Sequence, residues 1–445
     1  MPHRNRTGIL NNKNLFLKMI IRKILLAFLI FISICTGYAQ PQQGDIFRNY
    51  IWTTPTESGY DFLRVIGDGD YREPVNFAKV YPEECIEDGW LKIPYQIDLD
   101  NAVKAEIQVE KLLSHDGTRG LAVKVNNSDW FPFSEPENLP KPPYDYLYHN
   151  YPTVHIPLEF IKQEGNLLRF TVDSVQRFNM PQNILYGIHL RIYYSEKKEH
   201  ASAEITGITE NGEIGANVEF SLKNVRGKIK TTRYLGFYED VNYETDGKYR
   251  QWHYTFLRGK MLHHIGQSNV SPFKVEWNTN WIPDQIQPFE VAAIIEDESG
   301  INYFIQPVKN LLFDRDFRVE LCKPFNQPKM WATREQVFEE NFQLNGNPAD
   351  ISEFQLVWST WSPGYMNGIY LNDWLVFVKE GCHYCPGFHR ITLDSKYMLN
   401  TGLNSIKTGL TPRINGNMVH GAEILYPGIM VLVKYPKTII QNELH

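Results

Sequence analysis

The stretch Leu121-Ala-Val-Lys-Val-Asn-Asn-Ser-Asp-Trp130 returns late in the chain as Gly368-Ile-Tyr-Leu-Asn-Asp-Trp374. In each copy a short run of apolar residues ends at a pair that suits the left-handed backbone of a tight turn, Asn-Asn in the first and Asn-Asp in the second, and Trp begins the next run. The neighbouring blocks recur in the same order, with 105–109, 154–161, 164–172 and 184–194 matched by 354–358, 389–393, 401–407 and 424–435. This recurrence predicts two copies of one β-sandwich, over about 45–198 and 314–440.

The remaining sequence has the same character. Runs rich in Val, Ile, Tyr and Phe alternate with turn signals, and long amphipathic helical patterns are nearly absent. Short strands at this spacing are typical of sandwiches and barrels, so we predict an all-β protein. The segment between the copies predicts an immunoglobulin-like sandwich without the Cys…Trp…Cys signature of antibody domains, closing in a hairpin at Asp297-Glu-Ser-Gly300. The predicted domains are 40–200, 201–313 and 314–445.

Residues 1–39 contain six basic side chains and no Asp or Glu. Arg22 and Lys23 lead into an apolar run over 24–32, and the small residues Gly37 and Ala39 follow it. This is the order of a secretory signal peptide that is cleaved after Ala39, and the apolar run is too short to span a membrane comfortably. Cys35 raises a lipoprotein anchor as the alternative. We predict export to the periplasm or out of the cell.

The charge of the exported part excludes one class of function. Without the six basic residues of 1–39, the 45 basic side chains of the chain fall to 39, against 51 acidic ones, so the net charge is −12. A nucleic-acid-binding protein would carry the opposite sign, and no later segment has the apolar length of a membrane span. Aromatic residues make up 13% of the chain, which fits either stacking on sugar faces or large sandwich cores.

The densest group of chemically active side chains is Tyr249-Arg-Gln-Trp-His-Tyr254, with further histidines at 263 and 264. Elimination at C5 of a uronic acid needs a base, an acid and a cation that offsets the carboxylate charge. This stretch holds all three residue types, and its alternative is a structural hairpin. On a regular strand His253 and Tyr254 face opposite sides, so we favour His253 as the base, with His263 or His264 beside it. The predicted catalytic residues are His253, Tyr254, Arg250, His264 and His149.

A tyrosine-rich loop, Tyr144-Asp-Tyr-Leu-Tyr-His-Asn-Tyr151, follows the proline-rich segment 139–143. Tyrosine offers both a ring for stacking and a hydroxyl for hydrogen bonds, and loops on rigid scaffolds commonly hold sites. The alternative is an aromatic loop that docks on a neighbouring domain. The predicted substrate-binding residues are Tyr146, Tyr148, Trp130 and Trp252, with Trp374 as a further stacking platform if the protein only binds glycans.

Three shorter patterns contain ligand-type residues. Asp240, Asn242 and Asp246 place oxygen atoms at alternate positions, as calcium loops do, but the pattern lacks the glycine at the sixth position and the distal Glu of an EF-hand. We therefore expect a calcium-free acidic turn, with a calcium site as the alternative. Cys382-His-Tyr-Cys385, with His389, lacks the fourth ligand of a structural zinc site, so we predict a local disulfide or two unconnected thiols and no metal. His420-Gly-Ala-Glu423 is either a site or only the approach to the last strand. No cofactor is otherwise expected.

Each outer copy resembles the galactose-binding-like jelly roll, through a strand that ends in Asn and a turn and a later Gly-Asn-x-Leu turn that leads into the next strand. With Trp277-Asn-Thr-Asn-Trp281 in the middle segment, the whole order resembles secreted proteins of bacterial polysaccharide-utilisation loci, and is similar to an ulvan oligosaccharide dehydratase or lyase. The resemblance implies a carbon–oxygen lyase acting at uronic acids of acidic, ulvan-like oligosaccharides or polysaccharides. A non-catalytic glycan-binding protein is the alternative.

Overall fold

The computed structural model describes residues 41–53, 63–66, 86–87, 90–114, 119–173, 182–334, 336–378, 381–394 and 398–437. The chain forms two compact units, Met1–Pro41 and Gln42–His445, and only the second is described below. The predicted signal peptide and Cys85 lie outside the described residues. Within the described ranges the chain forms β-strands and single-turn 3-10 helices, which confirms the all-β class. None of those helices is long and apolar enough to cross a membrane.

The first sandwich packs two antiparallel sheets over a core drawn from residues 46–194. One sheet has the order β1 (Ile46–Thr53), β10 (Gln182–Tyr194), β5 (Ala102–Ser114) and β8 (Thr153–Ile156), with β2 (Leu63–Ile66) also beside β10. The other has the order β3 (Ile86–Glu87), β4 (Trp90–Lys92), β9 (Leu167–Asp173), β6 (Arg119–Val125) and β7 (Trp130–Pro132). Ile107 and Val109 on β5 face Val123 and Val125 on β6 across this core, in the period of two expected for strands.

The last sandwich repeats this strand order. Its first sheet runs β23 (Phe317–Cys322), β32 (Met430–Pro436), β26 (Glu353–Trp361) and β29 (Pro386–Leu393), with β31 (Glu423–Ile424) beside β26. Its second runs β24 (Pro324–Phe325), β25 (Glu339–Leu344), β30 (Gly402–Thr408), β27 (Ile369–Leu371) and β28 (Trp374–Phe377). Along the main path of each sheet these strands match the first sandwich, and Trp130 and Trp374 open the equivalent strands β7 and β28. The extra strands differ, because β2 pairs with β10 whereas β31 pairs with β26, the equivalent of β5. The predicted repeat is confirmed in the order of the main strands.

The repeat extends to a pair of asparagine networks. Asn126, just after β6, donates to Oδ1 of Asn166 at 3.0 Å, and Asn372, just after β27, donates to Oδ1 of Asn404 at the same 3.0 Å. Both first asparagines have the left-handed backbone expected of them, with φ of 52° and 51°. Each also accepts from the backbone N–H one residue beyond its partner, at 2.9 and 3.0 Å. The motif that repeats in the sequence is therefore a turn fixed by paired amides.

The middle segment forms a third core, between two further groups of strands. One group joins β12 (Glu213–Ile214), β22 (Val308–Phe313), β20 (Phe289–Asp297) and β21 (Asn302–Phe304). β14 (Ile229–Glu239) also pairs with β20, and β15 (Arg250–Trp252) and β18 (Gly266–Ser268) pair with β14. The other is β11 (Ser202–Thr206), β13 (Asn217–Arg226) and β19 (Val275–Asn278). β20 and β21 form the predicted hairpin at 297–300. β21 also pairs with β1, so the main sheet runs on from the first sandwich, and the domain limits remain predictions.

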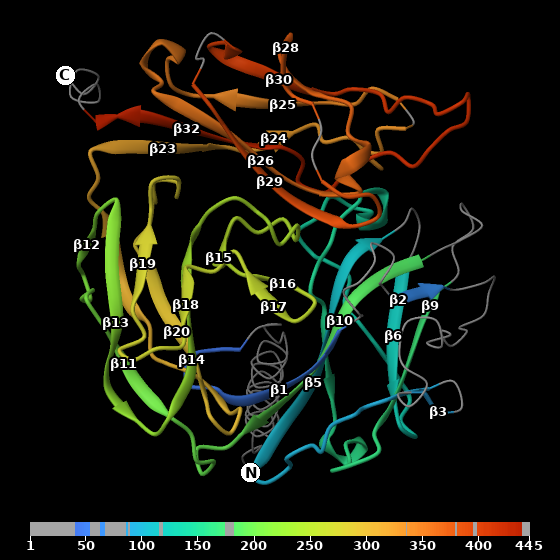
Figure 1. The fold of residues 1–445 in the computed structure, drawn as a ribbon, viewed down its shortest axis with the longest axis vertical. Helices are drawn as coiled ribbons and strands as arrows, with labels where there is room; N and C mark the ends of the chain where they lie inside the picture. Colours follow the sequence, from blue (N-terminus) through green and yellow to red (C-terminus); the bar gives the residue numbers. More distant parts are fainter. Residues whose placement is uncertain are drawn as a thin grey trace, which may run out of the picture. The chain divides into compact units, whose positions relative to one another are not determined.

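A short hairpin, β16 (Thr255–Leu257) and β17 (Lys260–Leu262), is fastened to the first sandwich by one carboxylate. Glu110 on β5 accepts from the backbone N–H of Arg258 at 2.6 Å and of Gly259 at 2.7 Å, and contacts Nε2 of His189 at 2.7 Å. Arg258 and Gly259 both have positive φ, as a two-residue hairpin turn requires. Figure 1 shows the hairpin between β14 and β10.

The 3-10 helices of the described residues are η3 (Pro143–Asp145), η4 (Leu158–Phe160), η5 (Pro348–Asp350) and η6 (Pro363–Tyr365).

Candidate functional site

The loop between β14 and β15 is organised around the side chain of Asn242. Its Nδ2 donates to Oε2 of Glu244 at 3.3 Å, to Oδ1 of Asp246 at 2.9 Å and to the carbonyl oxygen of Lys248 at 2.9 Å. Asp240, the third residue of the calcium-like pattern, instead accepts from the backbone N–H of Val241 at 2.8 Å. In the described part of the chain no group of three or more His, Cys, Asp or Glu is placed to hold a metal. The amide of Asn242 therefore links the acidic side chains of this turn.

His253 is buried against this loop, and both of its ring nitrogens are engaged. Nδ1 lies 3.1 Å from Oε1 of Glu244, and Nε2 faces the carbonyl oxygens of Tyr238 at 2.9 Å and Tyr249 at 3.1 Å. Burial alone would lower the pKa of His253, but the carboxylates of Glu244 and Asp240 outweigh it and raise that pKa to about 9. The imidazolium has no free lone pair at neutral pH, so His253 does not suit the predicted role of base.

His149, from the first sandwich, is bound to the same loop. Its backbone N–H donates to Oγ1 of Thr245 at 2.7 Å, and its Nε2 is hydrogen-bonded to the carbonyl oxygen of Tyr243. Because a carbonyl can only accept, Nε2 carries the proton and Nδ1 is left as an acceptor. Nδ1 has no partner among the described residues. Burial lowers the pKa of His149 to about 4, so the ring is neutral at neutral pH.

Three side chains from the middle and last sandwiches meet beside His149. The ring of Tyr243 lies flat on the imidazole of His263, with ring centres 3.8 Å apart and planes 8° apart. Nε of Arg390, on β29, donates to the Tyr243 hydroxyl at 3.4 Å. Oγ1 of Thr255 lies 2.8 Å from Nδ1 of His263. Arg390 is exposed and the two rings are half-buried, so solvent reaches the group, which we call the Tyr243–His263–Arg390 site.

The three groups of this site have pKa values that are shifted in different directions. Burial, and then the neighbouring His149 and Arg390, lower the pKa of His263 to about 3. Burial raises the pKa of the Tyr243 phenol against the opposing effect of Arg390. The partial loss of water around the Arg390 guanidinium would lower its pKa, but Tyr243 and Asp240 outweigh this effect and raise that pKa. At neutral pH the site therefore offers a neutral imidazole, a neutral phenol and one guanidinium cation.

The other predicted catalytic residues lie elsewhere. Arg250 donates to Oε1 of Gln285 at 3.2 Å and to the carbonyl oxygen of Pro288 at 2.6 Å, inside the middle sandwich. Tyr254 is buried in a small, separate hydrophobic cluster that also contains Phe256. His264 is half-buried, and neither of its ring nitrogens has a partner within the described residues. Burial and then Arg233 lower the pKa of His264 to about 4.

The predicted substrate-binding residues are dispersed as well. Tyr148 is fully buried; its hydroxyl donates to Oε2 of Glu135 at 3.0 Å and accepts from Lys111 at 3.2 Å. Tyr146 is half-buried and packs edge-on against Tyr426, with ring centres 5.8 Å apart. The tyrosine loop thus docks on the last sandwich, which was the alternative. Trp252 packs edge-on against Phe304, with ring centres 5.3 Å apart, and Trp130 is half-buried at the start of β7.

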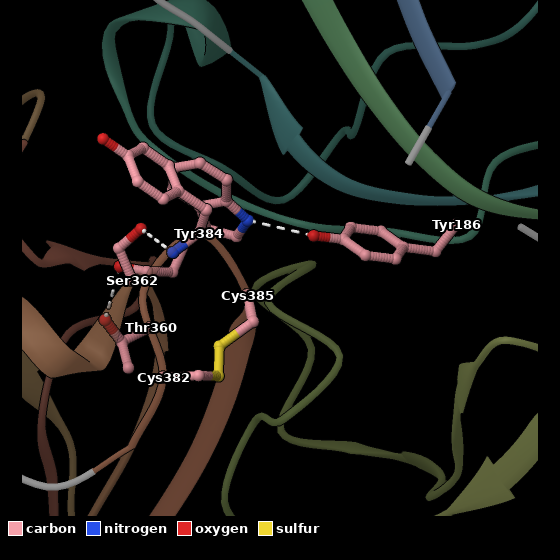
Figure 2. The surroundings of a disulfide bond; sticks show 7 residues. Tyr186, Thr360, Ser362, Cys382, Tyr384 and Cys385 are labelled. Atoms are coloured by element: carbon pink, nitrogen blue, oxygen red, sulfur yellow. Dashed lines mark hydrogen bonds between the residues drawn. A yellow bond between two sulfur atoms is a disulfide. The ribbon is translucent and has the colours of Figure 1, made fainter. Parts of the chain in front are cut away.

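Cys382 and Cys385 form a disulfide, which is one of the two states predicted for them (Figure 2). His389, weighed as a fellow zinc ligand, stacks on Trp358 with ring centres 4.9 Å apart. Burial lowers the pKa of His389 to about 4. Cys322 is a free, buried thiol.

Two residues of the site, Tyr243 and Arg390, were missed by sequence reasoning. Tyr243 lies inside the acidic loop, where the alternating oxygen ligands drew attention away from the aromatic ring between them. Arg390 is on β29, in a stretch considered only as a strand of the repeat and for the zinc question. A basic residue that faces outward on a strand gives no signal of its own, because its partner lies 147 positions away in the sequence.

One prediction concerns the buried His253–Glu244 pair. Because folding raises the pKa of His253 from about 6.5 to about 9, the stability that it contributes is fully present below pH 6.5 and is lost as the pH rises to 9. The free energy of unfolding should fall over that window by up to about 3 kcal/mol, at about 1.4 kcal/mol per unit. Urea unfolding at several pH values measures it. His253→Gln should remove most of this slope, and an unchanged slope in that variant would contradict the assignment.

No family model matches the sequence, and no curated protein matches it. Among solved structures, a β-porphyranase of glycoside hydrolase family 86 from the gut bacterium Bacteroides plebeius matches at 10% identity and TM-score 0.21, over 54% of this chain and 37% of that one. SGBP-B of the Bacteroides ovatus mixed-linkage glucan utilization locus, bound to a heptasaccharide, matches at 10% identity and TM-score 0.17, over 77% and 70%. The plant receptor-like kinase FER matches at 8% identity and TM-score 0.19, over 89% and 94%.

These likenesses are too distant to assign a function. The chain spans only about a third of the length of the family 86 chains that it matches. TM-scores near 0.2 carry no argument about activity, and bacterial glycan-active proteins and a plant receptor appear side by side at that level. What the fold defines is an all-β protein of packed sandwiches. Its function has to be argued from the residues of the site.

Proposed function

We propose that this chain is an exported carbohydrate-active protein that eliminates at uronic acid residues of acidic oligosaccharides. One observation carries the proposal. The exposed guanidinium of Arg390 is hydrogen-bonded to the phenol of Tyr243, and the Tyr243 ring lies on the neutral imidazole of His263. These are the cation, acid and base that elimination beside a carboxylate requires. The export part of the proposal rests on the signal-peptide pattern of residues 1–39.

The three groups take complementary roles in the proposed reaction. Arg390 pairs with the uronate carboxylate and offsets its charge, which makes the proton at C5 more acidic. His263 takes that proton, and the electron pair of the broken C5–H bond forms the C4=C5 double bond as the C4–O bond breaks. Tyr243 gives its hydroxyl proton to the departing oxygen, in keeping with a phenol that stays neutral. A bound carboxylate also raises the pKa of His263 toward its ordinary value, because opposite charges attract.

The proposal retains the predicted chemistry but moves it to different residues. The base moves from His253 to His263, and the cation moves from Arg250 to Arg390. His253 keeps a positioning role, because its ion pair with Glu244 holds the loop on which Tyr243 sits. His149 has the same kind of role through its hydrogen bond to the Tyr243 carbonyl oxygen.

The test is the appearance of an unsaturated uronate. Oligosaccharides that contain glucuronate or iduronate should give a rising ultraviolet absorbance with the purified protein, and the same oligosaccharides with their carboxyl groups reduced to alcohols should not. Arg390→Gln, which keeps length and polarity without the charge, should remove the activity. Absence of product from every uronate oligosaccharide, with the protein shown to be folded, would rule the proposal out.

A second candidate function is glycan binding without turnover. It is favoured by the exposed strand β28, where Trp374 and Leu375 are 53% and 51% exposed. An exposed tryptophan is a common platform for sugar rings. Binding of oligosaccharides that is lost in Trp374→Ala, with no unsaturated product from the unmodified protein, would favour this function over elimination.

A further inference from the structure

A second group of polar and aromatic side chains lies on the last sandwich, around the His420-Gly-Ala-Glu423 segment. Oε1 of Glu423 lies 3.3 Å from Nη1 of Arg334 and 3.5 Å from Nε2 of His420. The His420 ring is surrounded by aromatic rings, with centre-to-centre distances of 5.0 Å to Trp361, 5.2 Å to Tyr384 and 5.9 Å to Tyr365. The pattern that the sequence left open is therefore part of a cluster of charged and aromatic groups.

The carboxylate of Glu423 lies at the bottom of this cluster, and the other polar groups lie nearer the surface. Its side chain is 3% exposed, against 21% for Arg334 and 18% for His420. Its second oxygen, Oε2, has no hydrogen-bond partner among the residues that the structure describes. A buried carboxylate oxygen without a donor costs at least about 1–3 kcal/mol, so such atoms are normally satisfied by water or a ligand.

The His420 ring presents a second acceptor at the same place. Its Nδ1 lies 2.7 Å from the carbonyl oxygen of Gly421, so Nδ1 carries the proton. In the neutral ring Nε2 is then an acceptor that faces the carboxylate of Glu423, itself an acceptor. A hydroxyl group that donates to either atom would satisfy it.

The ring of Tyr384 is held in position by the backbone around it. Tyr384 lies between the two cysteines of the Cys382–Cys385 disulfide, and its backbone N–H donates to Oγ of Ser362 at 2.9 Å (Figure 2). The ring packs edge-on against Trp361, with centres 5.7 Å apart. Nε1 of that tryptophan donates to the hydroxyl of Tyr186 in the first sandwich at 3.1 Å. Because both sandwiches fix the tryptophan, the aromatic wall is built before any ligand arrives.

We infer that this cluster, Arg334, Tyr365, Tyr384, His420 and Glu423, binds a neutral sugar residue. Tyr384 is half-buried and makes edge-on ring contacts, so part of its ring is open to contact with the C–H face of a pyranose. Tyr365 is stacked on His383, with ring centres 4.1 Å apart, and supports the wall from behind. Arg334 donates hydrogen bonds, and Glu423 and His420 accept them, which matches the mixed donors and acceptors of adjacent sugar hydroxyls. The charges of Arg334 and Glu423 cancel, so the cluster has no surplus cation to attract a uronate carboxylate, unlike the site at Arg390.

The inference stands apart from the proposed elimination, because the two sites share none of these residues. Glu423 pairs with Trp361 across β31 and β26, and Trp361 pairs with Pro386 at the first residue of β29. Arg390 lies four residues further along β29, roughly 13 Å at about 3.3 Å per residue. A single oligosaccharide that carries both a uronate and a neutral sugar is the kind of ligand that would contact both places.

The experiment uses saturation-transfer NMR on the purified protein with methyl glycosides of glucose, galactose, mannose, xylose and rhamnose as probes. At least one of these is expected to bind. Tyr384→Ala, His420→Ala and Glu423→Gln should each weaken that binding by about tenfold or more, since each removes a ring contact or a hydrogen-bond acceptor. Phe325→Ala, which removes an exposed ring on β24 that belongs to neither proposed site, is the matched control and should bind as the unmodified protein does.

The outcomes separate the two proposals. Binding that persists in both Tyr384→Ala and His420→Ala would overturn the site even if Glu423→Gln failed to fold. Binding of none of the neutral probes, or of methyl glucuronide in their place, would overturn the choice of ligand. Arg390→Gln should leave this binding intact while it removes elimination, so failure of one proposal is visible without failure of the other.

Discussion

Replacing His263 by alanine is expected to lower turnover of uronate oligosaccharides by about two orders of magnitude or more, the usual loss when a general base is removed. Its Nδ1 lies 2.8 Å from the Thr255 hydroxyl. When Nδ1 donates that bond, Nε2 holds the lone pair that takes the C5 proton. The loss should fall on kcat with little change in KM, because the imidazole moves a proton and Arg390 holds the carboxylate. Initial rates of ultraviolet absorbance measure both constants.

Two further histidine variants make this prediction specific. His155→Ala, on the exposed side of β8, is the control and should keep the rate of the unmodified protein. His264→Ala tests the neighbouring residue that the sequence also predicted. If His264→Ala lost turnover while His263→Ala kept it, the base would be His264. Full turnover in both variants would end the assignment of a base to this hairpin.

The parts of the fold that depend on local sequence patterns could be predicted. The two copies of the outer sandwich were found because alternating apolar residues mark strands and because Asn126 and Asn372 stand where the backbone must turn. Those turns are closed by amide pairs, Asn126 with Asn166 and Asn372 with Asn404. These pairs explain why the same residues recur in the two copies. The pairing of β1 with β21 was not predictable, because no residue on an edge strand specifies which distant strand will meet it.

The site was harder to predict, because its chemistry depends on which residues fold against one another. His253 was predicted as the base, but Glu244, nine positions earlier, raises its pKa and makes it a buried cation. The same Glu244 lies in the acidic stretch that was considered for calcium binding. Tyr148 was expected to bind sugar, and instead its hydroxyl is bonded to Glu135 in the interior. In each case the residue type was informative, and its burial and partner decided what it can do.

Replacing Glu110 by alanine is expected to lower the free energy of unfolding by about 3 kcal/mol or more, because it leaves several buried donors without an acceptor, at about 1–3 kcal/mol each. Glu110 and His189 are both fully buried, with 2.7 Å between Oε1 and Nε2. The same carboxylate accepts from the backbone N–H groups of Arg258 and Gly259, and without it these two donors are left unsatisfied in the interior. Urea unfolding of the variant and of the unmodified protein gives the difference.

The position of Glu110 also makes a link to function testable. The hairpin that it fastens ends at Leu262, directly before His263, so Glu110→Ala should reduce elimination at temperatures where the protein is still folded. Glu110→Gln keeps one acceptor for the turn and should lose less stability than the alanine variant. Glu219→Ala, which removes an exposed ion pair with Lys274, is the matched control and should change the free energy of unfolding by no more than about 0.5 kcal/mol. If Glu110→Ala lost no more stability than Glu219→Ala, the Glu110 carboxylate would not be what holds the hairpin in place. The hairpin would then be held by the packing of Phe256 on His189, whose ring centres lie 4.8 Å apart.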